Sequence, residues 1–210
     1  MKTSLALLLL TAASAFAGTE NFDKSTGAPP KGWSSAVTGS GTAKWTVEKD
    51  DTAPSKPNVL KQSGEGDYPI ILNDDSAVKD GFVEVKGKAL DGKDDQAIGV
   101  VWRARDKDNY YVCRANALEG NVVLYKTVGG KRSSLDIVGR QGGYGVKASV
   151  EPRQWHTLRV EFAGDTFTVK WNGRELFQVK DATFTDAGKV GLWTKADSVI
   201  VFDDFNHGGK

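Results

Sequence analysis

Apolar residues in this chain recur mainly at every second position, in short runs separated by turn-forming residues. Successive side chains of a strand point to opposite faces, so such runs favour half-buried strands; no window shows the sustained 3.6-residue period of an amphipathic helix. Dipeptides such as Asp80-Gly81 and Asn172-Gly173 supply the positive φ angles that tight hairpins need. Strands are expected near residues 44–48, 59–62, 70–73, 82–89, 98–105, 110–116, 122–127, 133–138, 156–162, 166–171, 175–179, 190–194 and 199–205. Many short strands joined by such turns predict an all-β sandwich or barrel.

The first residues have the pattern of a secretory signal peptide. Lys2 precedes a leucine-rich stretch at 5–10, and the Ala-Phe-Ala segment at 15–17 matches an A-x-A cleavage site. We expect residues 1–17 to be removed and residues 18–210 to form one domain that is secreted or periplasmic. The apolar stretch is too short for a transmembrane helix, which needs roughly 20 apolar residues, so no membrane span is expected.

The expected mature chain is electrically neutral. Lys2 is the only charged residue among the first 17, so 28 Lys and Arg residues fall to 27, against 27 Asp and Glu. Nucleic acids and anionic membranes favour a clear basic excess, so neither is expected as the main partner. Cys113 is the only cysteine, which excludes an internal disulfide. Because it alternates with Tyr111 and Ala115, we expect it to be a core residue. We expect the domain to be a monomer.

Residues 96–132 hold two adjacent runs, each with an apolar side and a polar side. Ile98, Val100 and Trp102 form the apolar side of the first run, and Tyr111 and Cys113 belong to that of the second. Side by side in one sheet, the opposite sides would form one surface containing Arg103, Arg105, Tyr110, Arg114 and Asn116. Such a surface suits a polar ligand with hydroxyls or carboxylates.

This stretch and residues 188–205 (GKVGLWTKADSVIVFDDF) resemble bacterial secreted domains of the concanavalin A-like lectin/glucanase superfamily, specifically the 3-keto-disaccharide hydrolase-like group. Residues 109–121 (NYYVCRANALEGN) are similarly specific, whereas 154–162 (QWHTLRVEF) and 171–177 (WNGRELF) resemble laminin G-type sandwiches more generally. The likeness extends from about residue 21 to residue 205 and implies a two-sheet antiparallel jelly roll that handles glycans. That superfamily contains enzymes and binding modules, so the fold leaves both open.

No motif of a familiar hydrolase marks a catalytic centre. Family 16-type glucanases place their acids on one strand as E-x-D-x-x-E; the nearest segment here, residues 65–70 (EGDYPI), ends in isoleucine and is expected to be a loop. The chain also lacks G-x-S-x-G, H-E-x-x-H, a Walker loop and Cys/His zinc spacing. His156 is expected in a core or hydrogen-bonding role, and His207 in a mobile tail. Retaining glucanase chemistry is therefore disfavoured.

The resemblance implies a different reaction, in which the ketone of a 3-keto sugar acidifies the hydrogen at C2 and the aglycone leaves C1. That reaction needs a base near C2 and cations for the enolate. Arg103, Arg114 and Lys195 are the candidate cations. The candidate bases are Glu119, Asp203, Glu84 and Lys195, and their spacing marks none of them.

Six tryptophans suggest stacking against the apolar C–H face of a pyranose. Most of them alternate with core-like residues. Trp193, however, shares a side with Lys195, opposite Val190 and Leu192, and is the best stacking candidate.

The resemblance also suggests a calcium ion that ties the last strand to the N-terminal segment. Asp204 with Asp23 or Glu20 offers oxygen ligands, with structural hydrogen bonding as the alternative; no cofactor other than this structural calcium is expected.

Two functions remain open. The first is a saccharide-recognising domain, with hydrolysis or elimination of 3-keto-disaccharides as a possible activity, whose binding residues are Arg103, Tyr110, Arg114, Asn116, Trp193 and Lys195. The rival is a non-catalytic structural or adhesion domain that binds acidic polysaccharide or protein.

Overall fold

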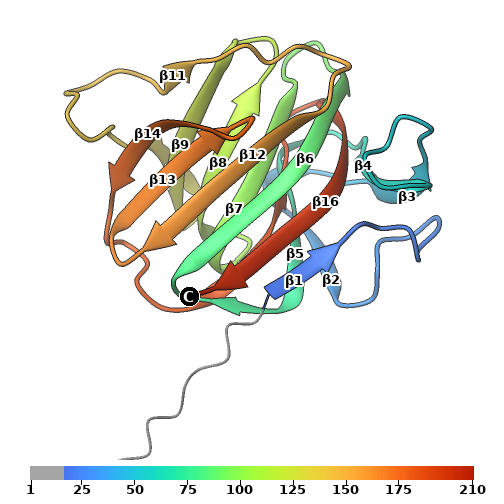
Figure 1. The fold of residues 1–210 in the computed structure, drawn as a ribbon, viewed down its shortest axis with the longest axis horizontal. Coiled ribbons are helices and arrows are strands. Elements are labelled where there is room, and N and C mark those ends of the chain that lie inside the picture. The colour runs from blue at the N-terminus through green and yellow to red at the C-terminus, as the bar shows by residue number, and fades with distance from the viewer. Residues whose placement is uncertain (1–16) are drawn as a thin grey trace, which may run out of the picture.

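The computed structural model describes residues 17–210, which form a sandwich of two antiparallel sheets (Figure 1). These residues form strands, turns and loops, and no helix among them is long and apolar enough to cross a membrane. The expected all-β jelly roll is confirmed. Residues 1–16, which hold most of the expected signal peptide, lie outside the described residues. Ala17, the expected last residue of that peptide, pairs with Gly208 in the described structure.

Sheet A forms the near layer in Figure 1. Its strands are β1 (Ala17–Glu20), β3 (Trp45–Lys49), β4 (Asn58–Gln62), β6 (Gly81–Asp91), β12 (His156–Ala163), β13 (Thr166–Trp171), β14 (Arg174–Lys180) and β16 (Val199–Gly209). They lie in the order β14-β13-β12-β6-β16-β4-β3, with β1 beside β16.

Sheet B lies behind sheet A and carries most of the predicted site. Its strands are β2 (Trp33–Gly41), β5 (Gly66–Val78), β7 (Ala97–Asp106), β8 (Asn109–Asn116), β9 (Asn121–Val128), β10 (Lys131–Ser134), β11 (Val146–Lys147) and β15 (Gly188–Trp193). They lie in the order β10-β9-β8-β7-β15-β5-β2, with β11 beside β9.

The main core lies between the sheets and follows the alternation in the sequence. Trp102 and Tyr111 are register partners on β7 and β8, and their rings stack with centroids 5.5 Å apart. Val100 and Cys113 are the next facing pair, and all four side chains are fully buried. Burial raises the pKa of the Cys113 thiol because the thiolate would lose its hydration. The prediction that these four residues form the core is confirmed.

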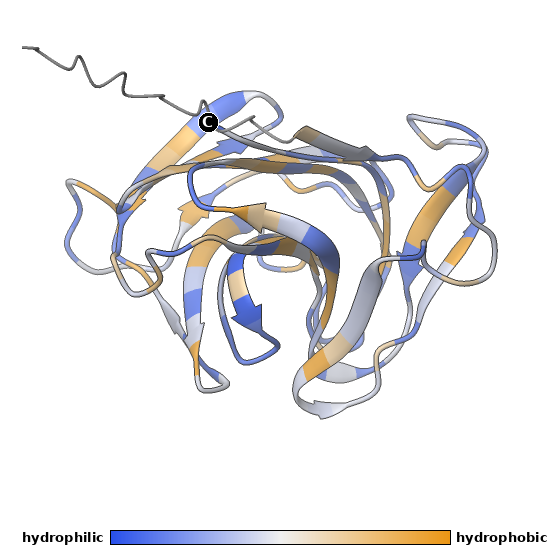
Figure 2. Cartoon of the chain, turned by 90° about the horizontal axis from the view of Figure 1, so that it is seen from below, coloured by the Kyte–Doolittle hydropathy of each residue, from blue (hydrophilic) through white to orange (hydrophobic). Residues whose placement is uncertain are grey.

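A second cluster fills the other face of sheet B. Its buried members are Ile70, Leu72, Ala97, Val101, Ala104, Tyr110, Val112, Val123, Tyr125 and Trp193. They are covered because the sheet curls around them (Figure 2). The hydroxyls of Thr38 on β2 and Tyr110 on β8 share a hydrogen bond at 2.8 Å, although three strands separate β2 from β8 in the sheet. The concave face of sheet B is therefore filled along its middle.

Some segments differ from the sequence-based expectation. Residues 65–70, expected as a loop, run into β5, and residues 33–41, where no strand is expected, form β2. Polar and small residues dominate β2, an edge strand, so it lacks the apolar alternation that marks the inner strands. The expected mobile tail at His207 is also wrong, since β16 continues to Gly209 and His207 pairs with Gly18.

Candidate functional site

Arg114 lies at the centre of a polar network on the concave face of sheet B. Its side chain is 1% exposed, and its guanidinium donates to the Glu119 carboxylate at 2.7 Å. It also donates to the hydroxyls of Tyr125 and Tyr144, both at 3.0 Å, and to the side-chain oxygen of Asn121. These partners come from the turn after β8, from β9 and from the loop before β11. Three separate segments therefore converge on one buried cation.

Glu119 is held as an anion by this network. Burial raises the pKa of the carboxyl, but the charge of Arg114 and hydrogen bonds from Asn121 and Arg114 outweigh burial and hold the pKa below its usual value. Asn116 donates to the second oxygen of Glu119 at 3.3 Å. Glu119 is therefore ionised at neutral pH.

A second ion pair adjoins the first. Asp95, 2% exposed, accepts hydrogen bonds from Asn116 at 2.5 Å and from Lys195. Asn116 therefore links the Arg114–Glu119 pair to the Lys195–Asp95 pair. The Lys195 side chain remains 30% exposed, whereas that of Arg114 is 1% exposed, so Lys195 is the cation of the network that reaches solvent.

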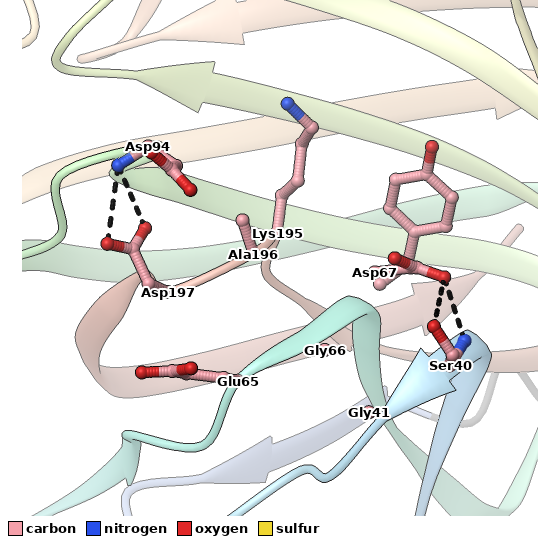
Figure 3. Close-up of a pocket in the computed structure, with 10 residues that line it drawn as sticks. Ser40, Gly41, Glu65, Gly66, Asp67, Asp94, Lys195, Ala196 and Asp197 are labelled. Atoms are coloured by element: carbon pink, nitrogen blue, oxygen red, sulfur yellow. Dashed lines mark hydrogen bonds between the residues drawn. The ribbon is translucent and has the colours of Figure 1, made fainter.

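A polar cavity of about 370 Å³ opens beside Lys195 (Figure 3). Its lining consists of Ser40, Gly41, Glu65, Gly66, Asp67, Tyr68, Asp94, Lys195, Ala196 and Asp197. Backbone and side-chain hydrogen bonds from Ser40 lower the pKa of Asp67, and Figure 3 shows both contacts. The Asp197 carboxylate accepts hydrogen bonds from the backbone of Asp94. The four carboxylates accept hydrogen bonds and the ammonium donates them, so the cavity suits hydroxyl groups, which can do both.

Arg132 on β10 lies on the same concave face. Its guanidinium carbon is 4.3 Å from the centroid of the Tyr125 ring, 4.6 Å from that of Tyr68 and 5.5 Å from that of Trp193. The ring of Tyr125 also contacts Arg114, whose guanidinium carbon lies 5.8 Å away. The two arginines therefore flank one tyrosine.

Trp193 lies on the concave face, as the alternation predicts, but it is fully buried. Its ring stacks on Tyr68 with centroids 5.5 Å apart, and its indole N–H donates to the Tyr110 hydroxyl at 3.3 Å. Tyr110 is fully buried as well. Both side chains are therefore packed beneath the site and do not reach solvent. Among residues 17–210, the aromatic side chain that is exposed is Tyr144, at 49%.

Arg103 does not join the other predicted binding residues. A register irregularity between Trp102 and Asp106 gives Arg103 a φ of 48° and reverses the alternation there. The buried guanidinium donates to the carbonyls of Lys79, Gly164 and Phe184 and to the carboxylate of Asp80. Arg105 is exposed and pairs with Asp186. The expected placement of Arg103 beside Arg114 is wrong.

Two candidate bases lie on sheet A, away from the network. Asp203 is fully buried on β16 and accepts hydrogen bonds from the backbone and hydroxyl of Ser55, both at 2.7 Å. Burial raises its pKa. Glu84 on β6 pairs with Arg159 on β12. Of the four candidates, the structure brings Glu119 and Lys195 to the concave face of sheet B.

The expected calcium ligands have other partners. Asp204 pairs with Lys86 at 2.7 Å, and Asp23 accepts a hydrogen bond from the backbone of Asn58 at 3.0 Å. Among residues 17–210, no group of three or more His, Cys, Asp and Glu side chains is arranged to hold a metal ion. The N-terminal segment is joined to β16 by the pairing of β1, and also through Ser55, whose hydroxyl contacts Asp203 and the carbonyl of Asn21.

Several site residues were missed from the sequence. Tyr125 had a signal, because it alternates with Val123 on the side opposite Leu124. Arg132 and Tyr144 had no such signal in the sequence, since Arg132 follows a glycine turn and Tyr144 lies in a glycine-rich loop.

Comparison with solved structures supports the fold. Carbohydrate-binding module CBM66 from Bacillus subtilis is similar at 20% identity and a TM-score of 0.65, over 83% of this chain and 94% of that one. Cellulose-induced protein Cip1 is similar at 12% identity and a TM-score of 0.64, over 89% and 94%. Bacillus licheniformis beta-glucanase is similar at 9% identity and a TM-score of 0.60, over 92% and 98%.

The sequence itself matches a family profile across nearly its whole described length. No curated protein sequence matches this chain. The profile described as 3-keto-alpha-glucoside-1,2-lyase-like domain matches residues 20–206, which include every residue of the polar network and of the adjoining cavity. The chain therefore belongs to the 3-keto-alpha-glucoside-1,2-lyase-like domain family.

Proposed function

We propose that this chain is a secreted or periplasmic carbohydrate-active domain that binds saccharides on the concave face of sheet B. The observation that carries the proposal is the link through Asn116 between two ion pairs, Arg114–Glu119 and Lys195–Asp95. These donors and acceptors hold one another in position before a ligand arrives. Binding of sugar hydroxyls then does not require these side chains to become ordered, which lowers the entropic cost of binding. Charged groups also form the stronger hydrogen bonds.

The surroundings of the network suit a saccharide. The polar cavity of about 370 Å³ beside Lys195 has room for part of a sugar ring and its hydroxyls. Tyr144 presents a half-exposed ring to the same surface and replaces Trp193 as the stacking candidate. Membership of the family and the likeness to a carbohydrate-binding module support the same class of ligand.

A screen of native and 3-keto disaccharides by calorimetry tests the proposal. Lys195→Met should weaken binding of the best ligand at least tenfold, because Lys195 is the network cation with an exposed side chain. Lys170→Met is a matched control, since Lys170 forms a similar ion pair with Glu161 on sheet A at 28% exposure. Equal loss of affinity in both variants, or no loss in Lys195→Met, would place the ligand elsewhere.

A second candidate function is elimination at the same site, and the position of Glu119 favours it. The Glu119 carboxylate is ionised and lies in the field of Arg114 and Lys195, which would stabilise an enolate. Glu119 would take the proton from C2 of a 3-keto glycoside, and the C1–O bond would break. The aglycone oxygen would gain a proton from water, leaving a ring with a C1–C2 double bond conjugated to the ketone.

Ultraviolet absorbance of the unsaturated ketone distinguishes the two candidates. Wild-type protein with a 3-keto disaccharide should generate the absorbance, and Glu119→Gln should abolish it while retaining binding. Thermal melts accompany this variant, because it leaves Arg114 buried without its anion. Tight binding with no product from the wild type would mean that the site binds saccharides and does not cleave them.

A further inference from the structure

Arg132 is set apart from the other buried or half-buried arginines by its lack of an anion. Arg103 pairs with Asp80, Arg114 with Glu119, and Arg159 with Glu84 and Glu161. None of the ion pairs within residues 17–210 includes Arg132, and its guanidinium donates no hydrogen bond to another described residue. One nitrogen, Nη1, is buried without an acceptor. A buried donor without an acceptor is costly, so a group that accepts hydrogen bonds from this guanidinium would be favoured.

The rings around Arg132 restrict how such a partner can approach. Tyr125 and Tyr68 lie 4.3 and 4.6 Å from the guanidinium carbon, and they come from β9 and β5 on opposite sides of the curled sheet. Aromatic rings at this distance attract the cation. Nε and Nη2 are not among the buried atoms without a partner, so the edge that carries them is the one that a ligand can reach. The edge of a guanidinium matches the two oxygens of a carboxylate, which bind it in one plane.

Charge is distributed unevenly along the concave face. Glu65, Asp67, Asp94 and Asp197 line the cavity beside Lys195 and would repel a carboxylate there. Arg132 and Arg114 lie on the two sides of Tyr125, and only Arg114 has a carboxylate partner. An acidic ligand is therefore favoured at Arg132, and neutral hydroxyls at the cavity.

We propose that the saccharide carries a uronic acid, whose carboxylate binds the edge of Arg132. This inference rests on the proposed saccharide-binding function, because it concerns the same face. The charge distribution also fixes the orientation of the ligand. The uronate lies against Arg132 and Tyr125, and a neutral sugar unit extends past Lys195 into the cavity.

Calorimetry with matched sugars tests the proposal. Each pair differs only at C6, as in glucuronosyl-glucose and glucosyl-glucose, with the methyl ester of the acid as a third ligand. The acid should bind at least tenfold more tightly than the neutral sugar and the ester, and added salt should reduce this preference. Arg132→Gln should abolish the preference, and Arg132→Lys should retain part of it, because lysine keeps the charge without the bidentate edge.

Arg159→Gln is the matched control. Arg159 also lies over an aromatic ring, with its guanidinium carbon 3.9 Å from the Phe82 centroid, but it belongs to sheet A. This variant should keep the preference for the acid. Equal affinity for acid and neutral sugars, with both bound at the Lys195-dependent site, would overturn the inference and leave saccharide binding intact. Absence of binding by every sugar of both series would overturn the inference and the proposed function together.

Discussion

Replacing Trp193 with alanine tests whether the second cluster is a true core or an exposed platform for a ligand. Trp193 is fully buried, stacks on Tyr68 and donates to Tyr110. A tryptophan buries roughly 150–250 Å², and at about 25 cal/mol per Å² its transfer contributes about 4–6 kcal/mol as an upper bound. Measured Trp→Ala changes in cores cost about 3–5 kcal/mol. The free energy of unfolding should fall by about that amount.

Urea denaturation followed by far-ultraviolet circular dichroism measures the loss, with the m-value compared between variants. Trp155→Ala is the control, because Trp155 is partly exposed and lies against Lys88 on sheet A; it should cost clearly less. Trp193→Phe should lose less than Trp193→Ala, since much of the ring remains. A loss below about 1 kcal/mol for Trp193→Ala, together with weaker sugar binding, would refute burial and restore Trp193 as a direct stacking residue.

Further predictions concern the thiol, acid stability and processing. Cys113→Ser should fold with a loss of about 1–3 kcal/mol in urea denaturation, because it forces a hydroxyl into the core; rapid thiol labelling of the native protein would contradict this burial. Burial raises the pKa of Asp181, but hydrogen bonds, first that from Lys126, outweigh it and lower the pKa to about 2 from 3.8. The unfolded chain then binds more protons between these values, so about 2 kcal/mol of stability should disappear as the pH falls from about 4 to 2; Asp181→Asn should lack that part of the acid dependence. Mass spectrometry of secreted protein should find Gly18 as the first residue, and retention of residues 1–17 would contradict cleavage after Ala17.

Alternation predicted the core well wherever the strands are regular. Trp102 and Tyr111 face sheet A, as their spacing requires, and their ladder has the expected register. The same rule failed one residue later at Arg103, because the irregularity after Trp102 reverses the side on which the next side chain lies. A sequence read at fixed period cannot show such a bulge, since the extra residue changes the backbone and leaves the pattern of residue types unchanged.

The residues of the site could be predicted only in part, because some of them meet through the curl of sheet B. Arg114 and Asn116 alternate along one strand, so their shared face could be read from spacing, whereas spacing did not single out Glu119 in the following turn. Arg132 and Tyr68 are 64 positions apart and meet only because sheet B curls, which no local pattern encodes. Curling also explains the error at Trp193: alternation gives the face of a strand, whereas exposure depends on whether another segment covers that face.

The curl of sheet B also has a consequence for self-association. A free edge strand offers unpaired N–H and C=O groups to a second chain and is a common starting point for aggregation. Here the edge strand β2 is drawn inward, since the Thr38 hydroxyl contacts the carbonyl of Lys107 and the hydroxyl of Tyr110. On sheet A, the segment before the glycine-rich loop forms a bridge from Ile137 to Val179 on the edge strand β14. Both sheets therefore shield an edge with segments of the same chain, which hinders strand addition between copies.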